Sequence, residues 1–164
     1  MIEPLVSPEQ FQGPAGVTHL CTGGEAPWLR RLDQVYAEFA RLKGGGAAGR
    51  AAIFAHADSC REKLGCLWGV PPASVSVLPS AAEAMAWLAR GLGWRRGDNV
   101  VTTNLEFPSV AYAWRDLEPQ GVSVRLVPHR DWIVEEADLL AAVDARTRVL
   151  AVSQVSFYTG QNLD

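Results

Sequence analysis

The strongest constraint on the fold is an alternation of short β-branched runs with helical segments from residue 74 onward. The runs are SVSVL (74–78), NVVTT (99–103), VSVRLV (122–127) and RVLAVS (148–153), and three segments with helical patterns separate them. Short apolar strands joined by amphipathic helices are typical of parallel sheets with right-handed crossovers and helices over their faces. We therefore predict an α/β fold with four strands and three helices in residues 74–164.

Residues 1–73 have a different pattern, an irregular start followed by two helices. Apolar residues recur at spacings of three and four behind Pro27, which suits a first helical turn. A second helix is predicted from about Ala48 to Trp68, where Gly69 and two prolines end it. The residues predicted to share one apolar face are Trp28, Leu32, Val35, Phe39 and Leu42 in the first helix, and Ile53, Cys60, Leu64 and Leu67 in the second.

The composition is that of a globular protein, with 164 residues, 48% hydrophobic residues and a net charge of −3. Basic residues are scattered, which argues against nucleic acid and against a membrane surface as partners. No apolar run approaches the roughly 20 residues of a membrane span, and no leader pattern is present, so we expect a cytoplasmic protein. The three cysteines and three histidines lack metal-ligand spacing, and we predict no metal site.

The predicted sheet indicates where a ligand would bind. Parallel α/β sheets bind ligands in the crevice outside the carboxyl ends of their strands. Three segments follow predicted strands at that edge, at 78–82, 104–109 and 153–160. They form the candidate site.

The first segment has two interpretations. Ser80 stands where a strand gives way to a helix, and the small residues Ala81 and Ala82 leave backbone N–H groups open to an anion such as phosphate. Ser80 could instead cap the helix, with Glu83 completing a capping box. Read alone, the residues favour capping.

The other two segments are also ambiguous. Phe107 precedes Pro108 at a predicted helix start, where Ser, Asp or Asn is normally found, and its ring could stack on a flat heterocycle or simply cover the helix start. Residues 153–160 carry hydroxyls, an amide and a phenol, and could hold the edge of a ligand or form a solvated turn. Composition does not separate these alternatives.

In order along the chain, these pieces resemble the class V aminotransferase family, which contains cysteine desulfurases, isopenicillin-N epimerase-like enzymes and kynureninases. The similar segments are THLCTGGEAP, AHADSCREKLGCLWGVPPASVSVLPSAAEAM, RRGDNVVTTNLEFPSVAYAW and VLAVSQVSFYTGQNLD. The resemblance implies the N-terminal portion of the large domain of a fold type I pyridoxal-phosphate enzyme, a parallel-sheet three-layer sandwich that is truncated here. It also implies an amino-acid substrate and a homodimer in the full-length form.

The resemblance assigns the cofactor to particular residues. Ala81 and Ala82 would offer backbone N–H groups to the phosphate of pyridoxal phosphate, with the hydroxyl of Ser80 beside them. Phe107 would stack on the pyridine ring, and Ser153 and Gln154 would lie near its hydroxyl side.

Two departures from the family pattern bear on the reaction branch. Ala82 stands where many members have a threonine, and Phe157 stands where desulfurases have an asparagine. Both argue against a desulfurase and towards the epimerase-like or kynureninase-like branches.

The chain contains no lysine suited to the Schiff base that this cofactor needs. Lys43 and Lys63, the only lysines, precede every predicted strand, and Asp164 falls too early to partner the pyridine nitrogen. We therefore predict no catalytic residue in this chain. The alternative function is a non-catalytic truncated remnant that keeps the fold and a phosphate site. A nucleotide-binding domain ranks last because LPSAAEA lacks a glycine-rich GxGxxG turn.

Overall fold

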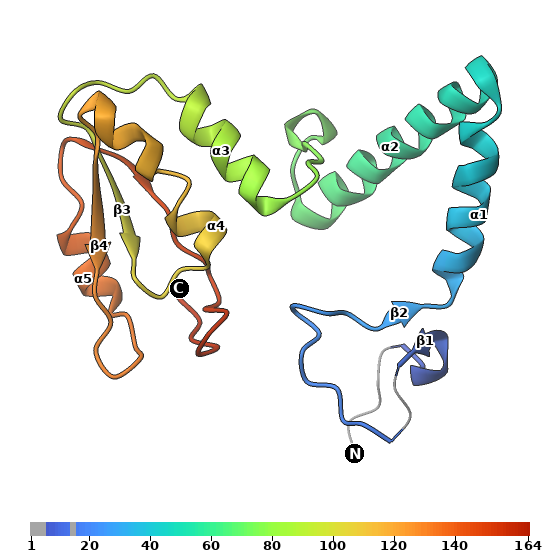
Figure 1. The fold of residues 1–164 in the computed structure, drawn as a ribbon, viewed down its shortest axis with the longest axis horizontal. Helices are drawn as coiled ribbons and strands as arrows, with labels where there is room; N and C mark the ends of the chain where they lie inside the picture. The colour runs from blue at the N-terminus through green and yellow to red at the C-terminus, as the bar shows by residue number, and fades with distance from the viewer. Residues whose placement is uncertain (1–5, 14–15) are drawn as a thin grey trace. The chain divides into compact units, whose positions relative to one another are not determined.

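The computed structural model describes residues 6–13 and 16–164 (Figure 1). Its chain contacts divide it into two compact units, with the boundary between Val77 and Leu78. Residues 1–5 and 14–15, part of the predicted irregular start, lie outside the described residues.

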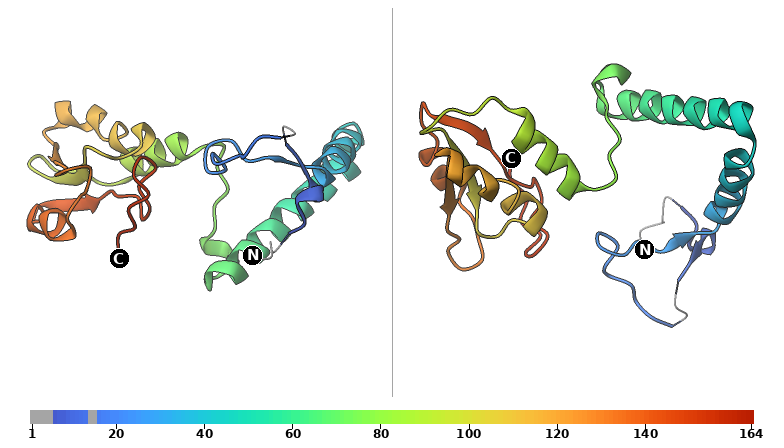
Figure 2. Two further views of the ribbon diagram at one scale, coloured as in Figure 1. Left: turned by 90° about the horizontal axis from the view of Figure 1, so that it is seen from below. Right: turned by 45° about the horizontal axis from the view of Figure 1, so that its top comes forward.

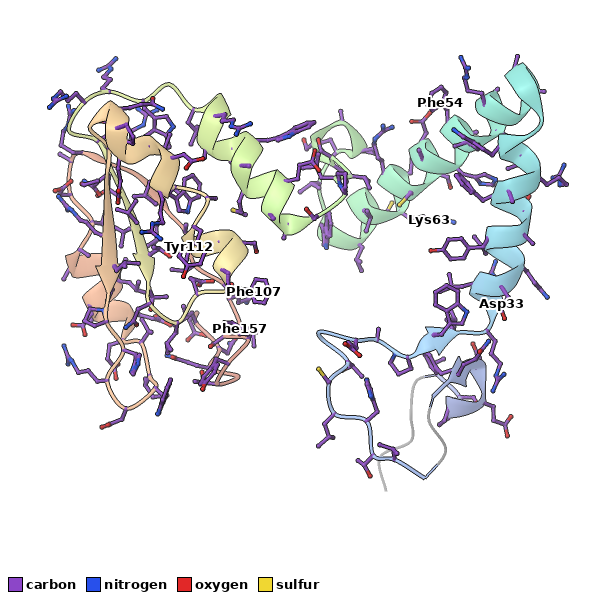
Figure 3. All side chains as sticks on the ribbon, in the orientation of Figure 1. Asp33, Phe54, Lys63, Phe107, Tyr112 and Phe157 are labelled. Atoms are coloured by element: carbon purple, nitrogen blue, oxygen red, sulfur yellow. The ribbon has the colours of Figure 1, made fainter. Side chains whose placement is uncertain are left out.

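The N-terminal unit begins with a 3-10 turn, η1 (Pro8–Gln10), and the short strands β1 (Phe11–Gln12) and β2 (Trp28–Leu29), which pair antiparallel. Helices α1 (Arg31–Lys43) and α2 (Gly46–Trp68) and a second 3-10 turn, η2 (Pro72–Ser74), follow. The predicted helix start at Pro27 is wrong, because Trp28 pairs with Gln12 in the strand ladder instead. The carboxylate of Asp33 fixes this arrangement by accepting hydrogen bonds from the Gln12 amide at 3.0 Å and the Trp28 indole at 2.8 Å (Figure 3).

Helices α1 and α2 meet at a glycine-rich corner (Figure 2). Gly49 of α2 is buried there, and a Cβ at this position would lie 1.8 Å from the backbone oxygen of Leu42. Only glycine therefore permits the close approach of the two helices. Gly69 ends α2 as predicted, in the left-handed conformation at φ +66°.

The apolar faces of these helices are largely open in the N-terminal unit. Val35 and Phe39 are each 48% exposed and Leu67 is 75% exposed. Helical periodicity shows which face is apolar, but it does not show whether another element covers that face.

The C-terminal unit contains the predicted parallel sheet. Its elements are α3 (Ala81–Gly91), β3 (Asn99–Thr103), α4 (Pro108–Ala111), η3 (Arg115–Gln120), β4 (Ser123–Val127), α5 (Glu136–Ala141) and β5 (Thr147–Leu150). The strand order is β4-β3-β5, with every pair parallel. Strand β3 lies at the centre and is buried throughout; its two valines pack into the cores on opposite faces, and its polar residues Asn99, Thr102 and Thr103 are buried with them.

Helical elements cover both faces of this sheet. On one face Val100 packs with Ala89 of α3 and with Trp114 and Leu117 around η3. On the other face Val101 packs with Leu139 of α5. Three layers are therefore present within the unit, and the predicted α/β three-layer class is confirmed.

Two predicted elements differ. Residues 74–78 form no strand; they leave η2 as unpaired extended backbone, so the sheet has three strands rather than four in the described part of the chain. A strand exists only where a neighbour completes its hydrogen-bond ladder, and β-branched composition cannot supply that neighbour. The residues after Phe107, predicted to form one helix, instead form two separate elements, α4 and η3. Pro119 lies inside η3, and a proline there is incompatible with a regular α-helix.

Candidate functional site

The structure brings together the segments that follow β3 and β5. Glu106, just beyond β3, accepts hydrogen bonds from Ser153, which lies beyond β5. The Ser153 hydroxyl donates to Glu106 Oε2 at 2.7 Å, and its backbone N–H donates to Oε1. These residues are 47 positions apart in sequence, so one carboxylate joins two loops at the carboxyl edge of the sheet.

Phe107 lies beside this junction and contacts the second loop itself. Its ring meets that of Phe157 edge to face, with centroids 5.0 Å apart and an interplanar angle of 85° (Figure 3). Phe107 occupies the N-cap of α4 without a side-chain hydrogen bond, as its sequence predicts, and 49% of it is exposed. The interpretation in which this ring is buried over the helix start is therefore wrong, and much of the ring is free for a ligand.

The predicted anion-binding turn starts α3. Ser80 is the N-cap, and its hydroxyl oxygen accepts the N–H of Glu83 at 3.2 Å, which confirms that Ser80 caps the helix. The return bond from the Ser80 N–H to the Glu83 carboxylate, which would complete the predicted capping box, is not among the hydrogen bonds of the described residues. The first intrahelical bond runs from Ala84 N–H to Ser80, so the exposed N–H groups of Ala81 and Ala82 have no helical acceptor. Capping and anion binding are compatible, because they use different N–H groups.

Helix α3 also contacts α4, the helix whose N-cap position is occupied by Phe107. Figures 1 and 2 show the start of α3 close to α4. The three predicted segments thus approach one side of the C-terminal unit, although only the segments after β3 and β5 are joined by hydrogen bonds.

The loop after β5 is an ordered hairpin-like structure rather than a free turn. Val155 bridges Asn162, and the backbone oxygen of Gln154 accepts the N–H of Leu163 at 2.8 Å. The side chain of Gln154 is exposed, and Ser153 is half-buried. Both predicted residues therefore lie at the sheet edge, one engaged by Glu106 and the other open.

Sequence reasoning missed three residues that shape this edge. Glu106 was part of a candidate segment but received no role, although it is the only carboxylate in residues 104–109. The side chain of Gln161 makes paired hydrogen bonds to the backbone of Val134, accepting at 2.9 Å and donating at 2.7 Å. The ring of Trp132, in the turn after β4, stacks on the ring of Tyr158, in the loop after β5. No periodic pattern marks these contacts, because they join distant segments.

The opposite edge of the sheet carries an ionic network. Arg125 of β4 donates to Asp144 at 2.6 Å, and the Asn99 amide of β3 donates to the same carboxylate at 3.0 Å. The Arg125 guanidinium, the backbone N–H of Arg146 and the Asn99 amide together hold the pKa of Asp144 well below its usual range. The network thus ties β3, through Asn99, and β4, through Arg125, to the segment that leads into β5.

Neither lysine lies in the unit that contains the candidate site. Both lie in the N-terminal unit, where Lys43 ends α1 and Lys63 lies within α2. Figure 3 labels Lys63. Residues 78–164 contain no lysine. The prediction that neither lysine is catalytic stays a prediction.

Within residues 6–13 and 16–164, no group of three or more His, Cys, Asp or Glu side chains is arranged to hold a metal ion. No described helix is both long enough and apolar enough to cross a membrane.

Known proteins share both the sequence pattern and the fold. The family model for aminotransferase class-V matches residues 29–164. An uncharacterized protein of Schizosaccharomyces pombe is 35% identical over 92 residues, which is 56% of this chain and 21% of that protein. A probable cysteine desulfurase of Methanothermobacter thermautotrophicus is 28% identical over 132 residues, 79% of this chain and 33% of that protein.

Solved structures establish the fold. A mutant of C-DES with glycine covalently linked to its PLP cofactor superposes with a TM-score of 0.85 at 23% identity, over 96% of this chain and 43% of that one. The Escherichia coli cysteine desulfurase CsdA superposes with a TM-score of 0.73 at 21% identity, over 87% of this chain and 39% of that one.

These similarities do not separate the reaction branches, and the argument against a desulfurase stays a prediction. The chain spans between a fifth and a third of the length of the curated relatives named above. The family itself follows from the model match across most of the chain together with the shared fold. This chain belongs to the aminotransferase class-V family.

Proposed function

We propose that this chain forms part of a pyridoxal-phosphate-dependent enzyme that acts on an amino acid. Pyridoxal phosphate is the cofactor of the aminotransferase class-V family, and the similar C-DES structure carries it. The observation that carries the proposal is the junction of Glu106 with Ser153 beside the exposed ring of Phe107. This junction brings two of the three expected cofactor segments to one sheet edge.

The start of α3 fits the phosphate group. Ala81 and Ala82 offer two N–H groups at the positive end of an eleven-residue helix, and their methyl side chains leave room for the phosphate oxygens. Ser80 already accepts a hydrogen bond from Glu83, but its hydroxyl hydrogen is still available for donation. The donor set is therefore suited to an anion.

The loops after β3 and β5 fit the heterocycle. Phe107 offers a half-exposed aromatic side chain for stacking, and the exposed Gln154 offers its amide to the ring's edge. Ser153, which donates its hydroxyl hydrogen to Glu106, offers its hydroxyl oxygen as an acceptor. When bound, pyridoxal phosphate supplies an electron sink for bond breaking at the amino-acid substrate. The residues of this chain would hold and orient the cofactor, and no residue of 78–164 is proposed to form the covalent bond.

The finer activity is open among transamination, epimerisation and lyase chemistry. Neighbours named as a cystine C-S lyase and a cysteine desulfurase support an amino acid as the substrate class. A homodimer in the full-length form and a cytoplasmic location are part of the same proposal.

The alternative is a non-catalytic chain that keeps a phosphate site without the covalent step. It is favoured by one observation, the absence of lysine from residues 78–164. The two functions differ in whether sodium borohydride fixes the cofactor to the protein.

The test is a titration of the purified chain with pyridoxal phosphate, followed by absorbance, with inorganic phosphate as competitor. We expect saturable binding that phosphate weakens. Phe107→Ala should raise Kd about tenfold, because an aromatic contact contributes about 0.5–1.5 kcal/mol beyond its buried area. Phe54→Ala is the matched control, since Phe54 is an exposed phenylalanine of α2 in the N-terminal unit (Figure 3).

Mass spectrometry after borohydride treatment completes the experiment. A cofactor-sized adduct on Lys43 or Lys63 would contradict the prediction that neither lysine is catalytic. Binding that phosphate does not weaken, or an equal loss in both phenylalanine variants, would contradict the proposed site.

A further inference from the structure

The turn after β4 holds a tryptophan in an unfavourable backbone conformation. Arg130 and Ile133 exchange two backbone hydrogen bonds, of 2.8 and 2.9 Å, around Asp131 and Trp132. These two central residues have φ values of +50° and +67°, the signs of a type I′ hairpin turn. Asparagine, aspartate and glycine suit such positions, whereas a bulky residue at positive φ is an outlier. Conformations of this kind persist only where surrounding contacts impose them.

Two neighbouring rings supply those contacts. The Trp132 ring stacks on His129 at a centroid distance of 4.8 Å and on Tyr158 at 5.0 Å, with interplanar angles of 12° and 24°. The backbone N–H of Trp132 also donates a hydrogen bond to His129 Nδ1 at 3.2 Å. Tyr158 belongs to the loop after β5, so the strained turn is attached to the loop that carries Ser153 and Gln154.

The ring contacts continue to the proposed stacking residue. The ring centroids of Tyr158 and Phe157 are 5.9 Å apart, and those of Phe157 and Phe107 are 5.0 Å apart. His129, Trp132, Tyr158, Phe157 and Phe107 thus form one series of touching rings, here called the aromatic ladder. The ladder joins the segments beyond β3, β4 and β5.

The loop after β5 is therefore held at separate points along its length. Glu106 binds its first residue, Ser153, and the paired Gln161 bonds to Val134 bind its far end. Between these ends, the ladder contacts at Phe157 and Tyr158 hold the tip. Trp132 is the only ladder residue whose backbone is strained in the described part of the chain.

We propose that Trp132 is a positioning residue that holds the tip of loop 153–160 through its stack on Tyr158. By way of Phe157 the same contact fixes the setting of the Phe107 ring. The consequence for cofactor binding rests on the function proposed above, whereas the positioning of the loop does not. A purely local role in the turn would be served better by glycine.

Trp132→Gly separates the two roles, because it removes the ring and relieves the strained backbone. The measurement is hydrogen exchange of peptides covering 153–161 in the cofactor-free chain. We expect exchange in the loop to accelerate about threefold to tenfold, the equivalent of one aromatic pair. Trp132→Phe keeps a ring and should retain most of the protection. Trp68→Ala is the matched control, because Trp68 is an exposed tryptophan at the end of α2.

Cofactor titration of the same variants gives the second readout. We expect Kd for pyridoxal phosphate to rise about threefold to tenfold in Trp132→Gly and to stay near the original value in Trp132→Phe. Unchanged loop exchange in Trp132→Gly, or an equal acceleration in Trp68→Ala, overturns the positioning role. If the unmodified chain does not bind pyridoxal phosphate, the proposed function fails, and the exchange experiment still decides the role of Trp132.

Discussion

Replacing Glu106 tests the junction on which the candidate site depends. Its carboxylate accepts both donors of Ser153 and also the N–H of Phe107, at 3.2 Å. Glu106→Ala removes every one of these acceptors. The half-buried Ser153 then keeps two donors that only water can satisfy.

The expected loss follows from the bonds removed. A hydrogen bond to a charged group contributes about 1.5–3 kcal/mol when well shielded, and unmet buried donors carry a further cost. Since both residues are only half-buried, water recovers part of this, and we expect a loss of about 2 kcal/mol for Glu106→Ala. Glu106→Gln keeps one acceptor oxygen and should lose about 1 kcal/mol.

Native-state hydrogen exchange is the suitable assay, because a chain with two compact units does not give one unfolding transition. The stability of the C-terminal unit is measured at peptides covering 99–103, in the buried strand β3. Glu118→Ala is the control, since Glu118 is an exposed carboxylate of η3 that makes no side-chain hydrogen bond among the described residues.

The order expected is a large loss for Glu106→Ala, about half for Glu106→Gln and little for Glu118→Ala. Equal protection in Glu106→Ala and Glu118→Ala would refute the reasoning. It would mean that the two loops are held together without this carboxylate.

Two further predictions concern stability. The pKa of Asp144 is lowered mainly by Arg125, so the stabilising effect of this carboxylate is complete above the ordinary aspartate value and fades as the pH falls below about 4. Asp144→Asn should flatten that loss in native-state hydrogen exchange of β3, measured between about pH 5 and pH 2.5. An identical pH profile in the variant would contradict this. Ser80→Ala removes the cap of α3 and should cost about 1 kcal/mol, whereas Ser80→Gly should cost only a few tenths, and amide exchange at the start of α3 distinguishes the two.

The sheet was the part of the fold most accessible from sequence. Strands β3, β4 and β5 lie where β-branched runs were noted, because β-branched residues fit the pleated surface of a sheet. The run at 74–78 has the same composition but forms no strand. Composition gives a segment the capacity to pair, and the presence of a partner strand is a property of the whole fold.

The candidate site was predictable to the level of segments and not of contacts. The carboxyl edge of a parallel sheet locates residues 104–109 and 153–160, and the structure joins them. The joining residue, Glu106, has no distinguishing local pattern. The stack of Trp132 on Tyr158 spans 26 positions and depends on a turn that sequence rules assign to smaller residues.

Two residues of the aromatic ladder break a local rule. Phe107 occupies a helix cap without capping it, and Trp132 occupies a left-handed position that glycine or asparagine would normally fill. Local rules are broken more often where function competes with stability. If each were an isolated accident, their rings would have no reason to be joined through Phe157 and Tyr158. Their connection at the sheet's carboxyl edge favours a single cause, the placement of an aromatic surface where a family cofactor would stack.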